Sequence, residues 1–264
     1  VDISEKDFCI NPDLIEAAIT EETTGIMATH VYGYPCNIER IEEVAKKHGL
    51  KVIYDAAHAF GIKLNGSSIL NKGDISTLSF HATKIFHTGE GGAVVTNDGD
   101  LAHKLEYHRN FGHKSQEDFW GLGVNGKVSE FHAAMGLCVM PYMEDIIKGR
   151  KRAVELYDQL LLKEKSVYRL QLPEDVTYNY SYYPILISTE EQLLRIHEAL
   201  NKEDIYPRRY FYPSLNKLPY INSQPSVPVA EDTSSRVLCL PLYPELTEKE
   251  VRLISQIILD NLEE

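Results

Sequence analysis

The chain has 264 residues, and its 43% apolar and 25% charged side chains are typical of a globular protein, not of a disordered or collagen-like one. Its 27 basic and 39 acidic residues give a net charge of −12, which disfavours binding to nucleic-acid phosphates. No apolar run approaches the roughly 20 residues that span a bilayer, so we expect neither a nucleic-acid nor a membrane partner.

The cysteines and the first residues bear on the cellular compartment. The four cysteines lie far apart, at positions 9, 36, 138 and 239, and form no Cys-x-x-Cys pair. This spacing disfavours a zinc site or a disulfide framework, so we expect no metal, free thiols and a cytoplasmic location. The first residues show no signal peptide. Since residue 1 is Val and residues 1–3 resemble the end of a strand, we expect the sequence to start inside a longer protein.

The first 145 residues alternate between helical and strand patterns. We expect helices at 12–20, 37–48 and 100–110, and strands at 25–31, 51–56, 74–80 and 92–96. The helix at 37–48 is the clearest, because Ile38, Ile41 and Val44 follow a helical period and Gly49 stands where a helix ends. Strands separated by helices pair in parallel, and ligands bind beyond their carboxyl ends.

In the second half of the chain, the regular alternation of helical and strand patterns gives way to one long helical pattern and shorter elements. A long helix is expected over 129–163, followed by short strands at 182–187 and 236–240 and helices at 190–201 and 247–262. We therefore predict two domains: 1–145, an α/β domain with a mainly parallel sheet, and 146–264, a smaller α+β domain that includes the linking helix.

Two strand ends carry the residues of chemical interest. Asp55 ends one strand, and Ser79 and Lys84 follow another, before a glycine-rich return at 89–92. Singly, each is most often a turn or surface residue. Together, a lysine amine and a carboxylate at neighbouring strand ends suit pyridoxal 5'-phosphate (PLP), in which the lysine forms a Schiff base and the carboxylate partners the pyridine nitrogen.

Other enzyme classes lack their motifs in this sequence. There is no Gly-x-Gly-x-x-Gly for a dinucleotide, no P-loop for a nucleotide triphosphate and no His-x-x-x-His zinc helix. Gly-x-Ser-x-Gly is also absent, which disfavours an α/β-hydrolase.

At the motif level the chain resembles a known family. Ser-Phe-His-Ala-Thr-Lys at 79–84, Gly-Glu-Gly-Gly at 89–92 and Asp-Ala-Ala-His at 55–58 resemble the signature of the DegT/DnrJ/EryC1/StrS nucleotide-sugar aminotransferases. The likeness resumes in three further segments, so it covers essentially the whole chain: 123–134, 206–213 and 240–243.

The resemblance implies a fold and a cofactor. The fold is PLP-dependent transferase fold type I (aspartate aminotransferase-like), with the large domain N-terminally incomplete in this chain. Family members begin well upstream of residue 1, and that part supplies a Gly-Ser/Thr segment that binds the cofactor phosphate. The implied cofactor is PLP.

The resemblance also implies roles for single residues. Lys84 is expected to be the catalytic lysine that bonds PLP and carries protons. Asp55 would pair with the pyridine nitrogen, His58 would lie near the cofactor ring, and Ser79 would bind its phosphate. Asn125 would reach the phosphate of the neighbouring subunit's cofactor, which implies a homodimer with shared active sites.

Substrate contacts are expected from His81, Arg209 and Tyr212. One departure concerns Asn125, which the family commonly follows with an aromatic residue and Arg, whereas Gly126 and Lys127 follow it here. This leaves the details of the Asn125 contact open.

The expected reaction is amino transfer from L-glutamate to a keto group, favoured at C4, of a nucleotide-linked deoxysugar such as dTDP-4-keto-6-deoxyglucose. Such sugars feed O-antigen and other polysaccharide biosynthesis. Lys84 argues against the family's dehydratase branch, which has lost this lysine. Two alternatives stay open: a C3-keto sugar nucleotide aminotransferase, and a catalytically silent, truncated PLP-fold scaffold.

Overall fold

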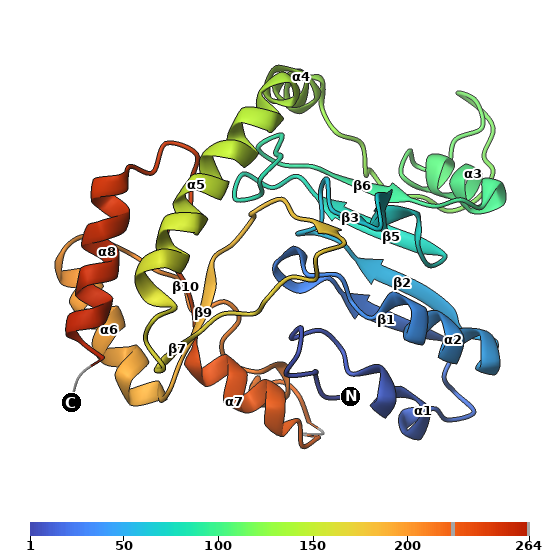
Figure 1. Cartoon of the computed structure of the whole chain (residues 1–264). Coiled ribbons are helices and arrows are strands. Elements are labelled where there is room, and N and C mark those ends of the chain that lie inside the picture. Colours follow the sequence, from blue (N-terminus) through green and yellow to red (C-terminus); the bar gives the residue numbers. More distant parts are fainter. Residues whose placement is uncertain (223–224, 263–264) are drawn as a thin grey trace. The chain divides into compact units, whose positions relative to one another are not determined.

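The computed structural model describes residues 1–222 and 225–262, which form two compact units (Figure 1). The first, here called the sheet unit, comprises Glu16–Met143 and Asp175–Asn179. The second, the C-terminal unit, comprises Val1–Ile15, Glu144–Glu174 and Tyr180–Glu264. The domain boundary after residue 145 stays a prediction.

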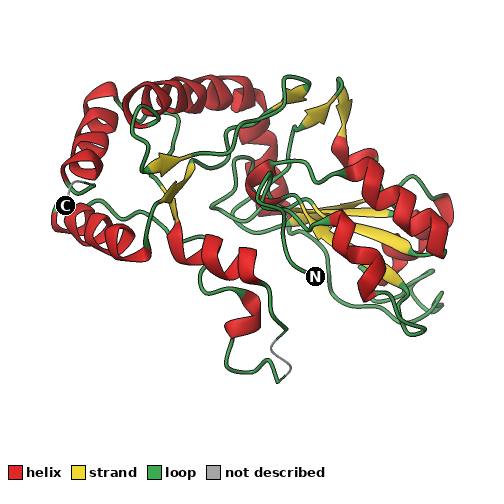
Figure 2. Cartoon of the chain, turned by 60° about the horizontal axis from the view of Figure 1, so that its bottom comes forward, coloured by secondary structure: helices red, strands yellow, loops and turns green. Residues whose placement is uncertain are grey.

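A four-stranded sheet forms the centre of the sheet unit, in the order β1-β2-β5-β6 (Figure 2). Its strands are β1 (Gly25–Thr29), β2 (Lys51–Asp55), β5 (Ile75–Ser79) and β6 (Gly92–Val95). The first three pair in parallel, so their carboxyl ends meet at one edge. β6 is antiparallel to β5, because residues 80–91 form turns instead of a crossover helix, so the sheet is mainly parallel, as predicted.

The helices before residue 143 are α1 (Ile15–Ala18), α2 (Ile38–His48), α3 (Gly99–His108) and α4 (Glu130–Val139). α2 packs on β1 and β2 through its buried residues Ile41, Val44 and Ala45. The side chain of Asn37 caps its first turn, and Gly49 ends it with a φ of 65°, a conformation that glycine adopts without strain. The predicted helix at 37–48 is thereby confirmed.

A smaller sheet joins two distant parts of the sequence. β3 (Lys63–Leu64) pairs with β4 (Ser67–Ser68) and with β8 (Val176–Thr177), both antiparallel. Residues 175–179 therefore return to the sheet unit after more than 30 residues in the other unit. No local sequence pattern predicts this return.

The C-terminal unit contains an antiparallel sheet in the order β10-β9-β7. Its strands are β7 (Val167–Tyr168), β9 (Pro184–Ile187) and β10 (Val237–Cys239). Its helices are α5 (Met143–Leu161), α6 (Glu190–Lys202), α7 (Pro228–Arg236) and α8 (Glu248–Asp260).

The single helix predicted over 129–163 is wrong. α4 ends at Val139, a 3-10 turn covers Met140–Tyr142, and α5 begins at Met143. Pro141 lies in that turn, and a proline inside a helix removes a backbone donor and clashes with the preceding turn.

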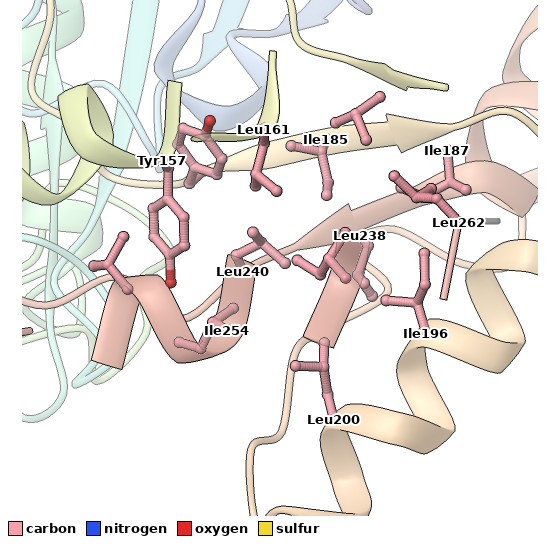
Figure 3. Close-up of a cluster of buried hydrophobic side chains, with 14 of the residues drawn as sticks. Tyr157, Leu161, Ile185, Ile187, Ile196, Leu200, Leu238, Leu240, Ile254 and Leu262 are labelled. Carbon is pink, nitrogen blue, oxygen red and sulfur yellow. The ribbon is translucent and has the colours of Figure 1, made fainter. Parts of the chain in front are cut away.

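Side chains from β9, β10 and three helices form the core of the C-terminal unit (Figure 3). Tyr157 and Ile254 come from α5 and α8, while Ile187, Ile196 and Leu238 come from β9, α6 and β10, and each is buried. Burying one large apolar side chain contributes about 1.5–3 kcal/mol, so this cluster is a main source of the unit's stability. In the part of the chain that the structure describes, no helix has the length and apolar character needed to cross a membrane.

Candidate active site

The carboxyl ends of β2 and β5 bring the predicted strand-end residues to one edge of the sheet. Asp55 is the last residue of β2 and stands opposite Thr77 of β5, two residues before Ser79. The backbone continues this pairing one residue further, since the Ala56 N–H donates to the Thr77 carbonyl at 2.8 Å. The position of the Asp55 backbone is therefore fixed by both neighbouring strands.

Asp55 is half-buried and starts the turn that follows β2. Its carboxylate Oδ1 accepts a hydrogen bond from the backbone N–H of Ala57 at 3.0 Å. Its backbone carbonyl accepts from the N–H of His30 at 3.0 Å. The negative charge of this carboxylate acts on a nearby lysine, as described next.

Lys84 lies half-buried in the turn between β5 and β6. Burial lowers the pKa of its amine from the ordinary 10.5, while the negative charge of Asp55 acts in the opposite direction. The two groups are thus close enough to influence one another. A lysine with a lowered pKa has more of the neutral amine, which is the nucleophilic form.

Aromatic packing holds the loop that carries Lys84. Phe86 is buried and its ring stacks on Phe60 at 4.6 Å between centroids, while Phe80 meets Phe86 edge-on at 5.0 Å. Phe60 follows β2 and the other two rings flank Lys84, so this cluster ties the two strand-end loops together. The loop that carries the lysine is therefore packed against the loop that follows the carboxylate's strand.

His58 lies in the loop that follows β2 and is 7% exposed. Burial, together with the positive charge of Lys84, lowers the pKa of His58 to about 3, so the ring is neutral at pH 7. Its Nδ1 accepts a hydrogen bond from the backbone N–H of Tyr32 at 3.0 Å. Lys84 is therefore electrostatically coupled both to His58 and to Asp55.

Ser79 and His81 lie at the start of the same loop. The Ser79 Oγ accepts from the His81 N–H at 3.4 Å, and the exposed His81 ring pairs with the Thr83 hydroxyl at 2.9 Å. His81 Nε2 also lies 3.7 Å from a carboxylate oxygen of Glu90. The roles predicted for Ser79 with phosphate and for His81 with substrate stay predictions.

The glycine-rich return into β6 has a steric reason. A Cβ on Gly92 would lie 2.6 Å from the carbonyl oxygen of Leu78, because β6 approaches β5 closely there. The Thr88 hydroxyl donates to the Glu90 carbonyl at 2.7 Å and closes the turn. These glycines let the lysine loop return directly into the sheet.

Asn125 lies in an exposed part of the sheet unit, within residues 109–128. Its side-chain oxygen accepts from the Lys127 amine at 2.8 Å, and that amine lies 4.0 Å from the centroid of the Phe111 ring. Its predicted contact with a neighbouring subunit's cofactor stays a prediction.

Arg209 and Tyr212 belong to the C-terminal unit. The Arg209 guanidinium stacks on the Tyr212 ring at 3.7 Å and donates to Glu190 at 2.6 Å and to the Ser235 carbonyl at 3.0 Å. These contacts hold the guanidinium in place. The substrate roles predicted for both residues stay predictions.

Two residues that the sequence analysis missed support the site. The hydroxyl of Tyr178 donates to the Tyr32 carbonyl at 2.7 Å. The Asn179 amide donates to the carbonyls of His58 and Phe60, each at 2.9 Å. Because 121 and 119 positions separate Asn179 from these two partners, no local sequence pattern indicates the contact.

The site has the composition of an enzyme that joins an amine to a carbonyl carbon: a lysine with a lowered pKa, a carboxylate and a neutral imidazole at the strand ends of an α/β sheet. The model of the DegT/DnrJ/EryC1/StrS aminotransferase family matches residues 1–259. The chain belongs to the DegT/DnrJ/EryC1/StrS aminotransferase family, and it is therefore an aminotransferase.

Individual relatives agree with the family. The chain is 41% identical over 253 residues to dTDP-4-amino-4,6-dideoxy-D-glucose transaminase of Shigella dysenteriae, a match that covers 94% of this chain and 69% of the relative. The crystal structure of DesI in the presence of its TDP-sugar product superposes with a TM-score of 0.92 and 31% identity, covering 100% of this chain and 69% of DesI. NtdA of Bacillus subtilis, solved with bound cofactor PMP, gives a TM-score of 0.90 and 28% identity, covering 100% and 62%. The predicted fold class, that of PLP-dependent sugar aminotransferases, is confirmed.

Proposed function

We propose that this aminotransferase moves the amino group of L-glutamate to the C4 keto group of a dTDP-linked 6-deoxysugar. The observation that carries the proposal is the 41% identity over 94% of the chain to a transaminase named for dTDP-4-amino-4,6-dideoxy-D-glucose. A product that bears nitrogen at C4 requires a 4-keto sugar as the acceptor. We take dTDP-4-keto-6-deoxyglucose as the substrate to test first.

The residues of the sheet unit fit PLP as the cofactor. Bound PLP supplies an aldehyde that bonds an amine and a ring that accepts electrons from the reacting carbon. The fit is in the donor set, because Lys84 is a half-buried amine with a lowered pKa and Asp55 is a carboxylate close enough to affect it. A neutral imidazole, His58, completes the set.

Each of these residues has a role derived from its own chemistry. Lys84 Nζ would bond the cofactor and, once released, would carry a proton between the substrate's reacting carbon and the cofactor carbon that bore the aldehyde. Asp55 holds a proton on the pyridine nitrogen by its negative charge. His58 donates a hydrogen bond without adding a positive charge beside Lys84, and Ser79 binds phosphate through its hydroxyl.

We propose a homodimer with shared active sites, in which Asn125 reaches the partner's cofactor. The support is a group of exposed apolar side chains on the segment 111–128 and on α4, since an exposed apolar patch of this kind commonly marks a protein interface. The group includes Trp120 (52% exposed), Leu122 (88%), Phe131 (89%) and Leu137 (77%). Leu122→Asp should shift the sedimentation coefficient from dimer to monomer, whereas Leu194→Asp, at an exposed leucine of the other unit, should not.

Mixing two inactive variants tests the shared site. In a hybrid of Lys84→Ala and Asn125→Ala subunits, one site carries both substitutions and the other carries none. Equal mixing should therefore restore up to about one quarter of wild-type activity. No recovery in a mixture shown to contain hybrid dimers would contradict the role of Asn125 across the interface.

The reaction is tested by absorbance and by trapping. Adding PLP should give a visible band that moves to the near-ultraviolet on addition of L-glutamate. Borohydride reduction and peptide mapping should then place the cofactor's mass on Lys84. Lys84→Ala should lose the trapped product, whereas Lys72→Ala, at an exposed lysine of the same unit, should keep it.

A substrate panel separates the candidate functions. Amino transfer to dTDP-4-keto-6-deoxyglucose supports the proposal, and transfer only to the 3-keto isomer supports the C3 alternative. Absence of both the visible band and the trapped lysine would support the alternative that the chain is a catalytically silent scaffold. In the residues that the structure describes, none of the four cysteines forms a disulfide, which supports the proposal of a cytoplasmic location.

A further inference from the structure

The segment 175–179 returns to the sheet unit directly against the loop that carries His58. Tyr178 is 6% exposed and Asn179 is 1% exposed, so both side chains are buried. Their hydrogen bonds go to the backbone: Tyr178 to the carbonyl of Tyr32, and Asn179 to the carbonyls of His58 and Phe60. The segment is thus hydrogen-bonded both to the turn at 31–33 and to the loop after β2.

The turn at 31–33 determines the tautomer of His58. The backbone N–H of Tyr32 can only donate, so the His58 Nδ1 at 3.0 Å must accept and carries no proton. A neutral imidazole holds its one proton on the other nitrogen, Nε2. His58 is neutral because burial and the charge of Lys84 lower its pKa.

Close packing keeps the turn against the histidine. A Cβ on Gly33 would lie 2.9 Å from the His58 carbonyl, 3.3 Å from the Tyr178 ring and 3.4 Å from the Asn179 side-chain oxygen. Gly33 has a φ of 87°, so this position needs glycine both for its space and for its backbone conformation. The turn, the histidine loop and the returning segment therefore meet at one point.

We propose that Tyr178 and Asn179 are positioning residues that hold the His58 ring in the tautomer with its proton on Nε2. Tyr178 acts through the Tyr32 backbone, and Asn179 acts through the backbone of His58 itself. The consequence for catalysis rests on the proposed function: beside Lys84, the Nε2–H is a hydrogen-bond donor for an anionic oxygen of the bound cofactor or substrate.

The direct test uses NMR on uniformly ¹⁵N-labelled protein without cofactor or substrate. A long-range proton–nitrogen spectrum at pH 7 should show His58 with its proton on Nε2, assigned by the loss of that signal in His58→Gln. A scalar coupling across the hydrogen bond should connect the Tyr32 amide nitrogen to His58 Nδ1. Both readouts are made on the wild-type protein, so they do not depend on the folding of any variant.

The positioning residues are tested by Tyr178→Phe and Asn179→Ala. Tyr178→Phe removes one hydroxyl and keeps the ring, and Tyr168→Phe, at an exposed tyrosine of the other unit, is its matched control. We expect both site variants to show mixed His58 tautomers and a weakened coupling to Tyr32. In Tyr178→Phe we expect kcat to fall about tenfold with little change in the KM for the sugar. Tyr168→Phe should match the wild type throughout.

The outcomes separate this proposal from the proposed function. A wild-type His58 that carries its proton on Nδ1, or that shows no coupling to Tyr32, overturns the proposal. Folded Tyr178→Phe and Asn179→Ala proteins with wild-type His58 spectra also overturn it. A correct tautomer in a protein that transfers no amino group would refute the proposed function and leave the positioning of His58 intact.

Discussion

The buried, neutral His58 makes the stability of the protein depend on pH in a calculable way. The pKa of His58 is about 3 in the folded state, against an ordinary value of 6.5. Between these two pH values the residue is therefore protonated in the unfolded chain and neutral in the folded chain. The stability that this difference provides is fully present above pH 6.5 and is lost as the pH falls toward 3. At pH 5.0 the loss from this one group is about 2 kcal/mol.

Urea denaturation at pH 7.5 and pH 5.0 measures this loss in the wild type and in His58→Gln. Glutamine can accept the Tyr32 hydrogen bond but does not titrate. The fall in unfolding free energy between the two pH values should therefore be smaller by about 2 kcal/mol in His58→Gln, whatever its stability at pH 7.5. Between pH 7.5 and 8.5 the two proteins should change alike. Equal falls between pH 7.5 and 5.0 would refute the assignment of a strongly lowered pKa to His58.

Further predictions concern structural contacts and use unfolding free energies from urea denaturation. Asp158→Ala should cost about 3 kcal/mol, because it removes the carboxylate that lies 2.9 Å from the buried Arg169 and pairs with its charge. Asp2→Ala should cost about 1 kcal/mol, since the Asp2 carboxylate accepts two backbone N–H groups at the start of α7, each at 2.9 Å. Gly92→Ala should cost about 1–3 kcal/mol because its methyl would collide with a carbonyl of β5, whereas Gly99→Ala, with open space around it, should be close to neutral. A Gly92→Ala protein as stable as Gly99→Ala would contradict the close approach of β6 to β5.

Features of the fold that depend on neighbouring residues could be predicted from the sequence. The helix at 37–48 was predictable because its cap, its apolar period and its terminal glycine all lie within 13 residues. The helix predicted over 129–163 failed at Pro141, because the apolar pattern continues across a residue that interrupts the backbone hydrogen bonds. The antiparallel direction of β6 could not be predicted, because a strand pattern does not show the direction of its neighbour.

The residues of the candidate site also differ in whether neighbouring sequence could predict them. Lys84 and Asp55 could be found because short motifs follow their strands, and the structure shows their electrostatic coupling. Tyr178 and Asn179 lie in a tyrosine-rich run with no helical or strand period, and their partners are more than 100 positions away. Only the tertiary structure shows that these residues border the site.

The position of the segment 175–179 in the sequence also determines when the surroundings of His58 can form during translation. The strands β1, β2, β5 and β6 are all translated by Val95, and the lysine loop with them. The turn beneath His58 must wait for Tyr178 and Asn179, which the ribosome adds more than 80 residues later. In a nascent chain the strands of the central sheet are therefore available early, but the contacts that fix His58 are completed only after residue 179 has been added.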